Sequence, residues 1–144
     1  MDSAERSIDV DASPDALFAV LLDYEAMPDW QSAVIATDVR ERDEQGRGTV
    51  VAFRIDVKVA KLRYVNRYTY DVPRAMGVEM IEGDMKSCET TYTFDELGNG
   101  RTRVTQRTTL DAGRFVPGPI KRLVAGQVLG EWLTQLKARA EAQA

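Results

Sequence analysis

Five polar residues fall where the strand pattern of this chain otherwise places apolar side chains. In segments that alternate with a period of two, Asn66, Glu82, Thr90, Gln106 and Thr108 all count to the apolar face. A dry core penalises each unpaired polar group by about 1–3 kcal/mol. Five such groups on inward faces predict a cavity with polar groups in its wall. The alternative is that each of them lies at a strand end or pairs with a neighbour in a closed core, and a one-residue slip of register would turn all five toward solvent.

Acid–base chemistry in such a cavity has few candidates. Glu82 is the one plausible inward carboxylate, and the hydroxyls of Tyr64 and Tyr68 are possible donors, so these three are the catalytic candidates if the protein is an enzyme. The chain has no histidine, which removes Ser-His-Asp and Cys-His nucleophiles, histidine zinc sites and facial-triad iron sites. Its one cysteine, Cys88, cannot form an internal disulfide or a Cys-x-x-Cys pair. We expect no metal and no cofactor.

Apolar and aromatic residues supply the rest of the predicted lining. Trp30 is a core plug or a ligand clamp, and Phe115, just before Pro117, belongs to a portal flap or to a buried loop. Flexible methionine and aromatic side chains suit an adaptable apolar pocket. The predicted ligand-binding residues besides the five polar ones are Trp30, Phe53, Ile55, Tyr64, Tyr68, Met80, Tyr92, Phe115, Leu129, Trp132 and Leu133.

The elements that must position these residues follow from turn chemistry and periodicity. A strand over 4–11 precedes a short helix that begins at Ser13-Pro14-Asp15, with Ser13 as the cap, and a second short turn covers 24–29. Six strands then follow, and their short connections imply antiparallel neighbours. A helix over 119–141 has a broad apolar stripe that can cover the sheet. The strands are predicted at 33–42, 47–59, 61–72, 75–83, 86–96 and 101–112.

Composition narrows the class of protein. At 144 residues the chain predicts one domain, residues 1–144. The net charge of −4, with basic residues interleaved among acidic ones, argues against a nucleic-acid partner. No apolar run reaches the roughly 18 residues of a membrane span, and the N-terminus has no signal-peptide pattern, so we expect a cytoplasmic protein. The sequence identifies no protein partner.

The order of elements resembles the helix-grip fold of the START-like (SRPBCC) superfamily over essentially the whole chain. Ala12-Ser13-Pro14-Asp15-Ala16-Leu17-Phe18 and the segment from Asp23 to Trp30 are similar to the opening helices of that superfamily. Glu82-Gly83-Asp84-Met85-Lys86 and the last helix resemble its polyketide cyclase/dehydrase and coenzyme-Q-binding branch. The resemblance implies an α+β fold: a curved, seven-stranded antiparallel sheet wrapped around a long C-terminal helix, with two short helices after the first strand. It also implies a tunnel for a lipid, sterol, isoprenoid quinone or polyketide.

Three functions are compatible with these features. We expect a small hydrophobic ligand held in the cavity by a non-catalytic carrier or sequestering module, because the arginines of the strands count to the outward face and no acid–base pair is evident. The alternative is a polyketide cyclase or dehydratase that acts in the same cavity. A third hypothesis uses the outward Arg63, Arg67, Arg103 and Arg107 as a docking surface, although acidic residues on the same face favour an ordinary solvated surface.

Overall fold

The computed structural model describes residues 2–58, 60–111, 113–114, 116–126 and 131–143. Strand β1 (Asp2–Val10) is followed by helix α1 (Pro14–Leu22) and the 3-10 helix η1 (Tyr24–Asp29). Six strands come next, and the C-terminal region contains helices α2 (Gly118–Gly126) and α3 (Trp132–Gln143). The six strands are β2 (Val34–Arg42), β3 (Gly48–Asp56), β4 (Lys61–Asp71), β5 (Ala75–Gly83), β6 (Ser87–Gly98) and β7 (Arg101–Asp111).

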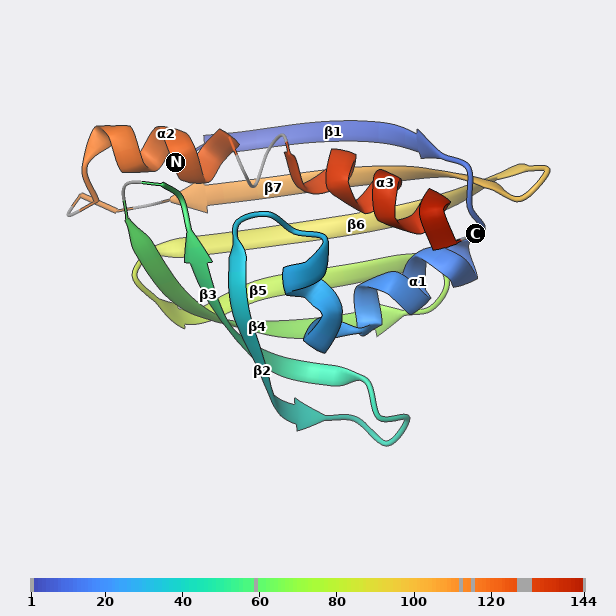
Figure 1. Cartoon of the computed structure of the whole chain (residues 1–144), viewed down its shortest axis with the longest axis horizontal. Coiled ribbons are helices and arrows are strands. Elements are labelled where there is room, and N and C mark those ends of the chain that lie inside the picture. The colour runs from blue at the N-terminus through green and yellow to red at the C-terminus, as the bar shows by residue number, and fades with distance from the viewer. Residues whose placement is uncertain (1, 59, 112, 115, 127–130, 144) are drawn as a thin grey trace.

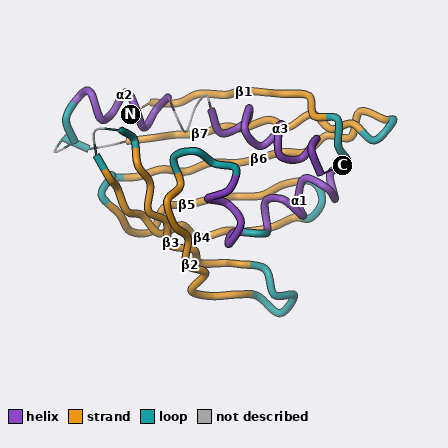
Figure 2. Tube along the Cα trace, in the orientation of Figure 1, coloured by secondary structure: helices purple, strands orange, loops and turns teal. Residues whose placement is uncertain are grey.

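The strands form one antiparallel sheet. Over the described residues it has seven strands in the order β1-β7-β6-β5-β4-β3-β2, so only the β1–β7 pair joins strands that are distant in sequence. Figure 2 shows the twist of the sheet: β6 and β7 run roughly horizontally, whereas β2 and β3 run steeply from top to bottom. The predicted α+β helix-grip architecture is confirmed, and each strand lies within a few residues of its predicted range.

The helices cover one side of the sheet (Figure 1). Helix α1 begins as its sequence predicts, because the Ser13 hydroxyl accepts a hydrogen bond from the Ala16 N–H at 3.2 Å and Pro14 occupies the first turn. Helix α3 packs against β1 and α1, and η1 packs against β2. The helix predicted over 119–141 is represented by α2 and α3, and residues 127–130 between them lie outside the described residues. None of the described helices is long and apolar enough to cross a membrane.

A β-bulge in β5 changes the face on which one predicted residue lies. Asn66 of β4 pairs with Met80, but the preceding residue, Val65, pairs with Glu82, so Ile81 is an extra residue in β5. Past the bulge the alternation is reversed, and the Glu82 side chain is exposed on the outer face of the sheet. The prediction that Glu82 points inward is therefore wrong. The strand then returns close to β4, where a Cβ on Gly83 would lie 2.7 Å from the Tyr64 Cβ.

Candidate functional site

An apolar cavity lies between the inner face of the sheet and the helices. Its volume is about 90 Å³, and its wall comes from β3 to β6 together with α1, η1, the start of β2 and the first residue of α3. None of the described lining residues is charged. They are Leu21, Tyr24, Met27, Ala33, Val34, Phe53, Ile55, Tyr64, Asn66, Tyr68, Met76, Val78, Met80, Met85, Cys88, Thr90, Tyr92 and Trp132.

Aromatic rings form one wall of the cavity. Phe53 stacks on Tyr64 with ring centroids 5.2 Å apart, and Tyr24 packs on Tyr68 at 4.9 Å. Burial raises the pKa of Tyr24, Tyr64, Tyr68 and Tyr92 well above the ordinary value for a phenol. At neutral pH these groups are therefore neutral hydroxyls, which can donate or accept a hydrogen bond but cannot serve as anionic bases.

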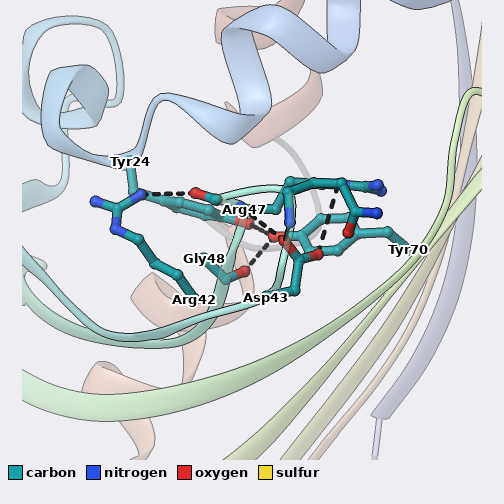
Figure 3. A network of polar contacts seen from close by, with 8 residues as sticks. Tyr24, Arg42, Asp43, Arg47, Gly48 and Tyr70 are labelled. Atoms are coloured by element: carbon teal, nitrogen blue, oxygen red, sulfur yellow. Dashed lines mark hydrogen bonds and ion pairs between the residues drawn. The ribbon is translucent and has the colours of Figure 1, made fainter.

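Tyr24, which lines the cavity, is connected through Tyr70 to the turn between β2 and β3 (Figure 3). The Tyr70 hydroxyl donates to the Gly48 carbonyl at 2.5 Å, so its 2.6 Å contact with the Tyr24 hydroxyl is one in which Tyr24 donates. The Arg47 guanidinium lies 5.7 Å from the centre of the Tyr70 ring, at cation–π distance. Arg42 pairs with Glu25 of η1 at 2.6 Å. These contacts hold the turn against the outer side of Tyr24.

A buried polar seam runs beside the cavity on β6 and β7. The Gln106 amide donates to the Thr108 hydroxyl at 3.1 Å, and Thr108 contacts the Thr90 hydroxyl at 3.0 Å. All three residues are buried, but only Thr90 lines the cavity. Gln106 and Thr108 therefore point inward as predicted, yet they bond within the sheet rather than opening onto the cavity.

Trp132, the first residue of α3, lies at the helical side of the cavity. Its carbonyl accepts a hydrogen bond from the buried Gln31 amide at 3.2 Å, and its ring packs on Trp30 with centroids 5.6 Å apart. Burial raises the pKa of Tyr92, and the nearby Trp132 indole lowers it in part. Within the described residues, however, the buried Nε1 of Trp132 makes no well-formed hydrogen bond.

Nine of the predicted lining residues are brought together at the cavity. They are Phe53, Ile55, Tyr64, Asn66, Tyr68, Met80, Thr90, Tyr92 and Trp132. Asn66, the one amide among them, donates to the Tyr68 hydroxyl at 3.3 Å. The strand residues in this set were predictable because the pleat alone fixes which face they share.

Other predicted residues lie elsewhere. Leu133 is 4% exposed and belongs to the packed core. The Trp30 ring packs on Trp132 and does not line the cavity, which agrees with the core-plug alternative. Glu82 lies on the outer face, for the reason given above. Phe115 and Leu129 lie outside the described residues.

The sequence did not reveal the lining from α1, η1 and the turn before β2, which includes Leu21, Tyr24, Met27 and Ala33. Short helices and turns carry no two-residue period that relates them to the sheet. Met76 and Val78 were detectable, because they share the inward face of β5 with Met80. Cys88 also lines the cavity, and burial raises the pKa of its thiol.

A second hollow lies on the opposite face of the same strands. This outer groove has a volume of about 360 Å³ and is lined by charged residues of β2 to β5 and the turn after β5, with Ala36, Ala52 and Val65 between them. The charged residues are Asp38, Arg40, Arg54, Arg63, Glu82 and Asp84. Among the described residues no cluster of three or more His, Cys, Asp or Glu side chains could hold a metal ion.

Comparison with solved structures identifies the same fold in other proteins. A START superfamily protein from Mycobacterium smegmatis matches with a TM-score of 0.85 and 19% identity, covering 99% of each chain. The Zhui aromatase/cyclase from Streptomyces sp. R1128 matches with a TM-score of 0.79 and 17% identity, covering 99% of this chain and 94% of the other. A conserved protein from Geobacillus kaustophilus has a TM-score of 0.79 at 10% identity, with 99% and 97% covered. At these identities the likeness establishes the fold alone.

Sequence comparison assigns the family. A search among curated proteins finds no match. Residues 1–141 match the family described as polyketide cyclase/dehydrase and lipid transport. Because this match spans nearly the whole sequence, the chain belongs to the polyketide cyclase/dehydrase and lipid transport family.

Proposed function

We propose that the protein binds a small, neutral, hydrophobic molecule in the cavity and carries or sequesters it without chemical change. The observation that supports this most strongly is the composition of the wall: aromatic, aliphatic and methionine side chains, with no charged group among the described lining residues. A charged ligand would lose its hydration there and find no counter-charge. A neutral apolar ligand gains from burial of its surface.

The methionine side chains of the cavity wall can change conformation to fit a ligand. Met27, Met76, Met80 and Met85, four of the five methionines in the chain, line the cavity. The cavity of about 90 Å³ is smaller than the roughly 150 Å³ apolar cavity that accepts benzene. Binding of even one ring therefore requires side chains to move, and the unbranched methionine side chain changes rotamer at low cost.

The lining supports a carrier better than a cyclase or dehydratase. A general base must lie within hydrogen-bond reach of the bound substrate. Glu82, the predicted carboxylate, lies on the outer face, and the cavity tyrosines are held in their neutral form. Tyr64 and Tyr68 therefore serve in this proposal as hydrogen-bonding groups of a binding site, beside Asn66 and Thr90.

Methyl NMR tests the proposal directly. Protein labelled with [methyl-¹³C]methionine is titrated with toluene, and saturable shifts of the four cavity methionine signals are expected. Benzoate and benzylammonium, of similar size, should bind at least about tenfold more weakly, because their charge would be desolvated without a partner. Absence of saturable shifts with toluene, or equal binding of the charged compounds, would overturn the proposal.

Matched variants locate the binding site. Ala33 is buried in the cavity wall, so Ala33→Leu fills space there and should weaken toluene binding about tenfold or more. Ala52→Leu adds the same atoms on the outer face of β3, in the outer groove, and should leave binding unchanged. A weakening by Ala52→Leu alone would place the ligand outside the cavity. Native mass spectrometry of the purified protein then gives the mass of any molecule that the protein retains.

A further inference from the structure

The indole N–H of Trp132 is a hydrogen-bond donor in the cavity wall for which the described residues supply no well-formed acceptor. Its Nε1 is buried and makes no well-formed hydrogen bond within them. Buried donors in native proteins are nearly always paired, so such a group calls for an explanation. Trp132 lines the cavity, which places this donor where a ligand atom could reach it.

Trp132 is held at its backbone and at its ring. The Gln31 amide, in a fully buried residue, donates to the Trp132 carbonyl at 3.2 Å. The Trp30 ring packs on the indole with centroids 5.6 Å apart. A donor that is fixed in this way loses little freedom when it binds an acceptor, which favours selective recognition.

A second donor lies beside it. Tyr92 also lines the cavity, and the Trp132 indole N–H lies close enough to the Tyr92 oxygen to lower the pKa of that phenol as a donor, although the contact is not a well-formed hydrogen bond. Burial keeps this phenol protonated, so its O–H is available to donate. Indole N–H can only donate, and together the two groups match an oxygen atom that accepts two hydrogen bonds, as a carbonyl does.

We propose that Trp132 and Tyr92 form a carbonyl-recognising subsite, which makes the preferred ligand of the cavity a neutral molecule with an apolar ring and a carbonyl oxygen. This inference rests on the proposed binding function and adds a chemical class to it. Trp132 and Tyr92 are then the specificity-determining residues. The aromatic wall of Phe53, Tyr64 and Tyr68 contacts the ring.

Two isosteric probes separate this inference from binding in general. Acetophenone and α-methylstyrene have the same heavy-atom skeleton and nearly the same size, but only acetophenone carries an oxygen acceptor. The chain has two tryptophans, so the ¹⁵N-labelled protein gives two indole N–H signals, and Trp30→Phe assigns them. Acetophenone should move the Trp132 indole proton downfield as a hydrogen bond forms, and α-methylstyrene should not.

Variants supply the second measurement, with binding followed by the methionine methyl signals. Trp132→Phe and Tyr92→Phe should each weaken acetophenone about five- to tenfold and change α-methylstyrene by less than about twofold. Trp30 lies outside the lining, and Trp30→Phe keeps an aromatic ring against the Trp132 indole, so this variant should affect both probes equally. The indole shift in the wild-type protein needs no substitution in the cavity, so it tests the subsite even if Trp132→Phe does not fold.

The outcomes are distinct. Two results would overturn the subsite and leave the binding function standing. One is saturable binding of both probes with equal losses in the variants, and the other is a Trp132 indole proton signal that does not move downfield when acetophenone is bound. Absence of saturable methionine shifts with either probe would overturn the binding function, and the subsite with it.

Discussion

The two faces of strands β3 to β5 carry hollows of opposite character. The inner cavity has a volume of about 90 Å³ and no charged residue among its described lining, whereas the outer groove measures about 360 Å³ and contains three arginines and three acidic residues. Consecutive residues separate to the two sides: Phe53 is buried in the cavity wall, and Arg54 is exposed in the groove. Size alone would favour the outer groove, whereas the proposed binding function rests on the apolar wall of the inner cavity. The chemistry of the wall distinguishes a site that removes a ligand from water from a groove that stays hydrated.

The bulge at Ile81 makes this separation complete. The pleat alone would place Glu82 on the same face as Met76, Val78 and Met80. One extra residue in β5 moves the carboxylate to the outer groove instead. The cavity thereby remains free of a charge that would need a partner there.

Alkaline pH should abolish the folded state, which is the largest effect expected. All five tyrosines are shifted in the same direction: burial raises the pKa of Tyr70 to about 12 and raises the others well above 10. A folded-state pKa above the unfolded value of about 10 contributes stability that is complete below pH 10 and is lost as pH rises toward and past 12. Phenolate absorbance and loss of circular dichroism should therefore appear together above about pH 10.

A control uses the least buried of these phenols. Tyr70 is half-buried, so part of the phenolate signal can precede unfolding near pH 12. Tyr70→Phe should remove that early part. Full ionisation of several tyrosines near pH 10 with an intact circular dichroism spectrum would show that the aromatic wall is open to water.

Adjacent substitutions on the two faces should differ sharply in stability. Phe53 is 3% exposed and packs on Tyr24, Tyr64 and Tyr68, so Phe53→Ala should lower the free energy of unfolding by about 3–5 kcal/mol. Arg54→Ala, one residue along β3, should change it by no more than about 0.5 kcal/mol. Arg54 lies directly opposite Arg63, so the substitution removes one partner of an unfavourable like-charge pair and no stabilising contact between the two. Urea denaturation of both variants measures the difference, and similar losses would contradict the assignment of faces.

Deletion of Ile81 should remove the bulge and leave Glu82 on the outer face. Glu82 would then follow Met80 directly and keep Val65 as its partner, and consecutive residues of a regular strand point to opposite faces. Because no carboxylate enters the apolar cavity, the deletion should lower the free energy of unfolding by about 0.5–3 kcal/mol, and urea denaturation should give the same loss at neutral and at mildly acidic pH.

The matched control combines the Ile81 deletion with Glu82→Gln. This protein has no carboxylate at the position, so it should be about as stable as the single deletion at each pH. Glu82→Gln alone should be close to neutral, because the side chain is exposed. A loss in the single deletion that shrinks as pH falls and is absent from the double variant would mean that the Glu82 carboxylate had entered the cavity, which would contradict the assignment of faces.

The same bulge shows where sequence reasoning stops. The fold was predictable because period-two alternation and short turns fix seven strands and their antiparallel order. The inward strand residues of the cavity followed from the same alternation. Glu82 was misplaced because an extra residue leaves no mark in the composition of a strand, and its effect appears only in the pairing of Val65 and Asn66 with β5.

Segments outside the sheet were harder for a different reason. Tyr24 and Met27 reach the cavity from η1, and Ala33 reaches it from the turn before β2. Their contribution depends on how these elements dock on the sheet, which local periodicity does not encode. Gln106 and Thr108 show the converse case. Their inward direction was predictable, but their hydrogen bonding within the sheet depends on the alignment of β6 with β7.

The smallest effect is expected for ion pairs on the outer face. Arg107 of β7 pairs with Glu5 of β1 at 2.9 Å, and both side chains are more than half exposed, at 57% and 58%. A double-mutant cycle with Arg107→Ala and Glu5→Ala should give a coupling free energy below about 1 kcal/mol, because water and salt screen the pair. Measurement of the cycle by urea denaturation at low and at high salt should show the coupling fall further as salt is added. A coupling of several kcal/mol that does not respond to salt would mean that this face is shielded from water, and the contrast between a dry inner wall and a hydrated outer face would then fail at the β1–β7 edge.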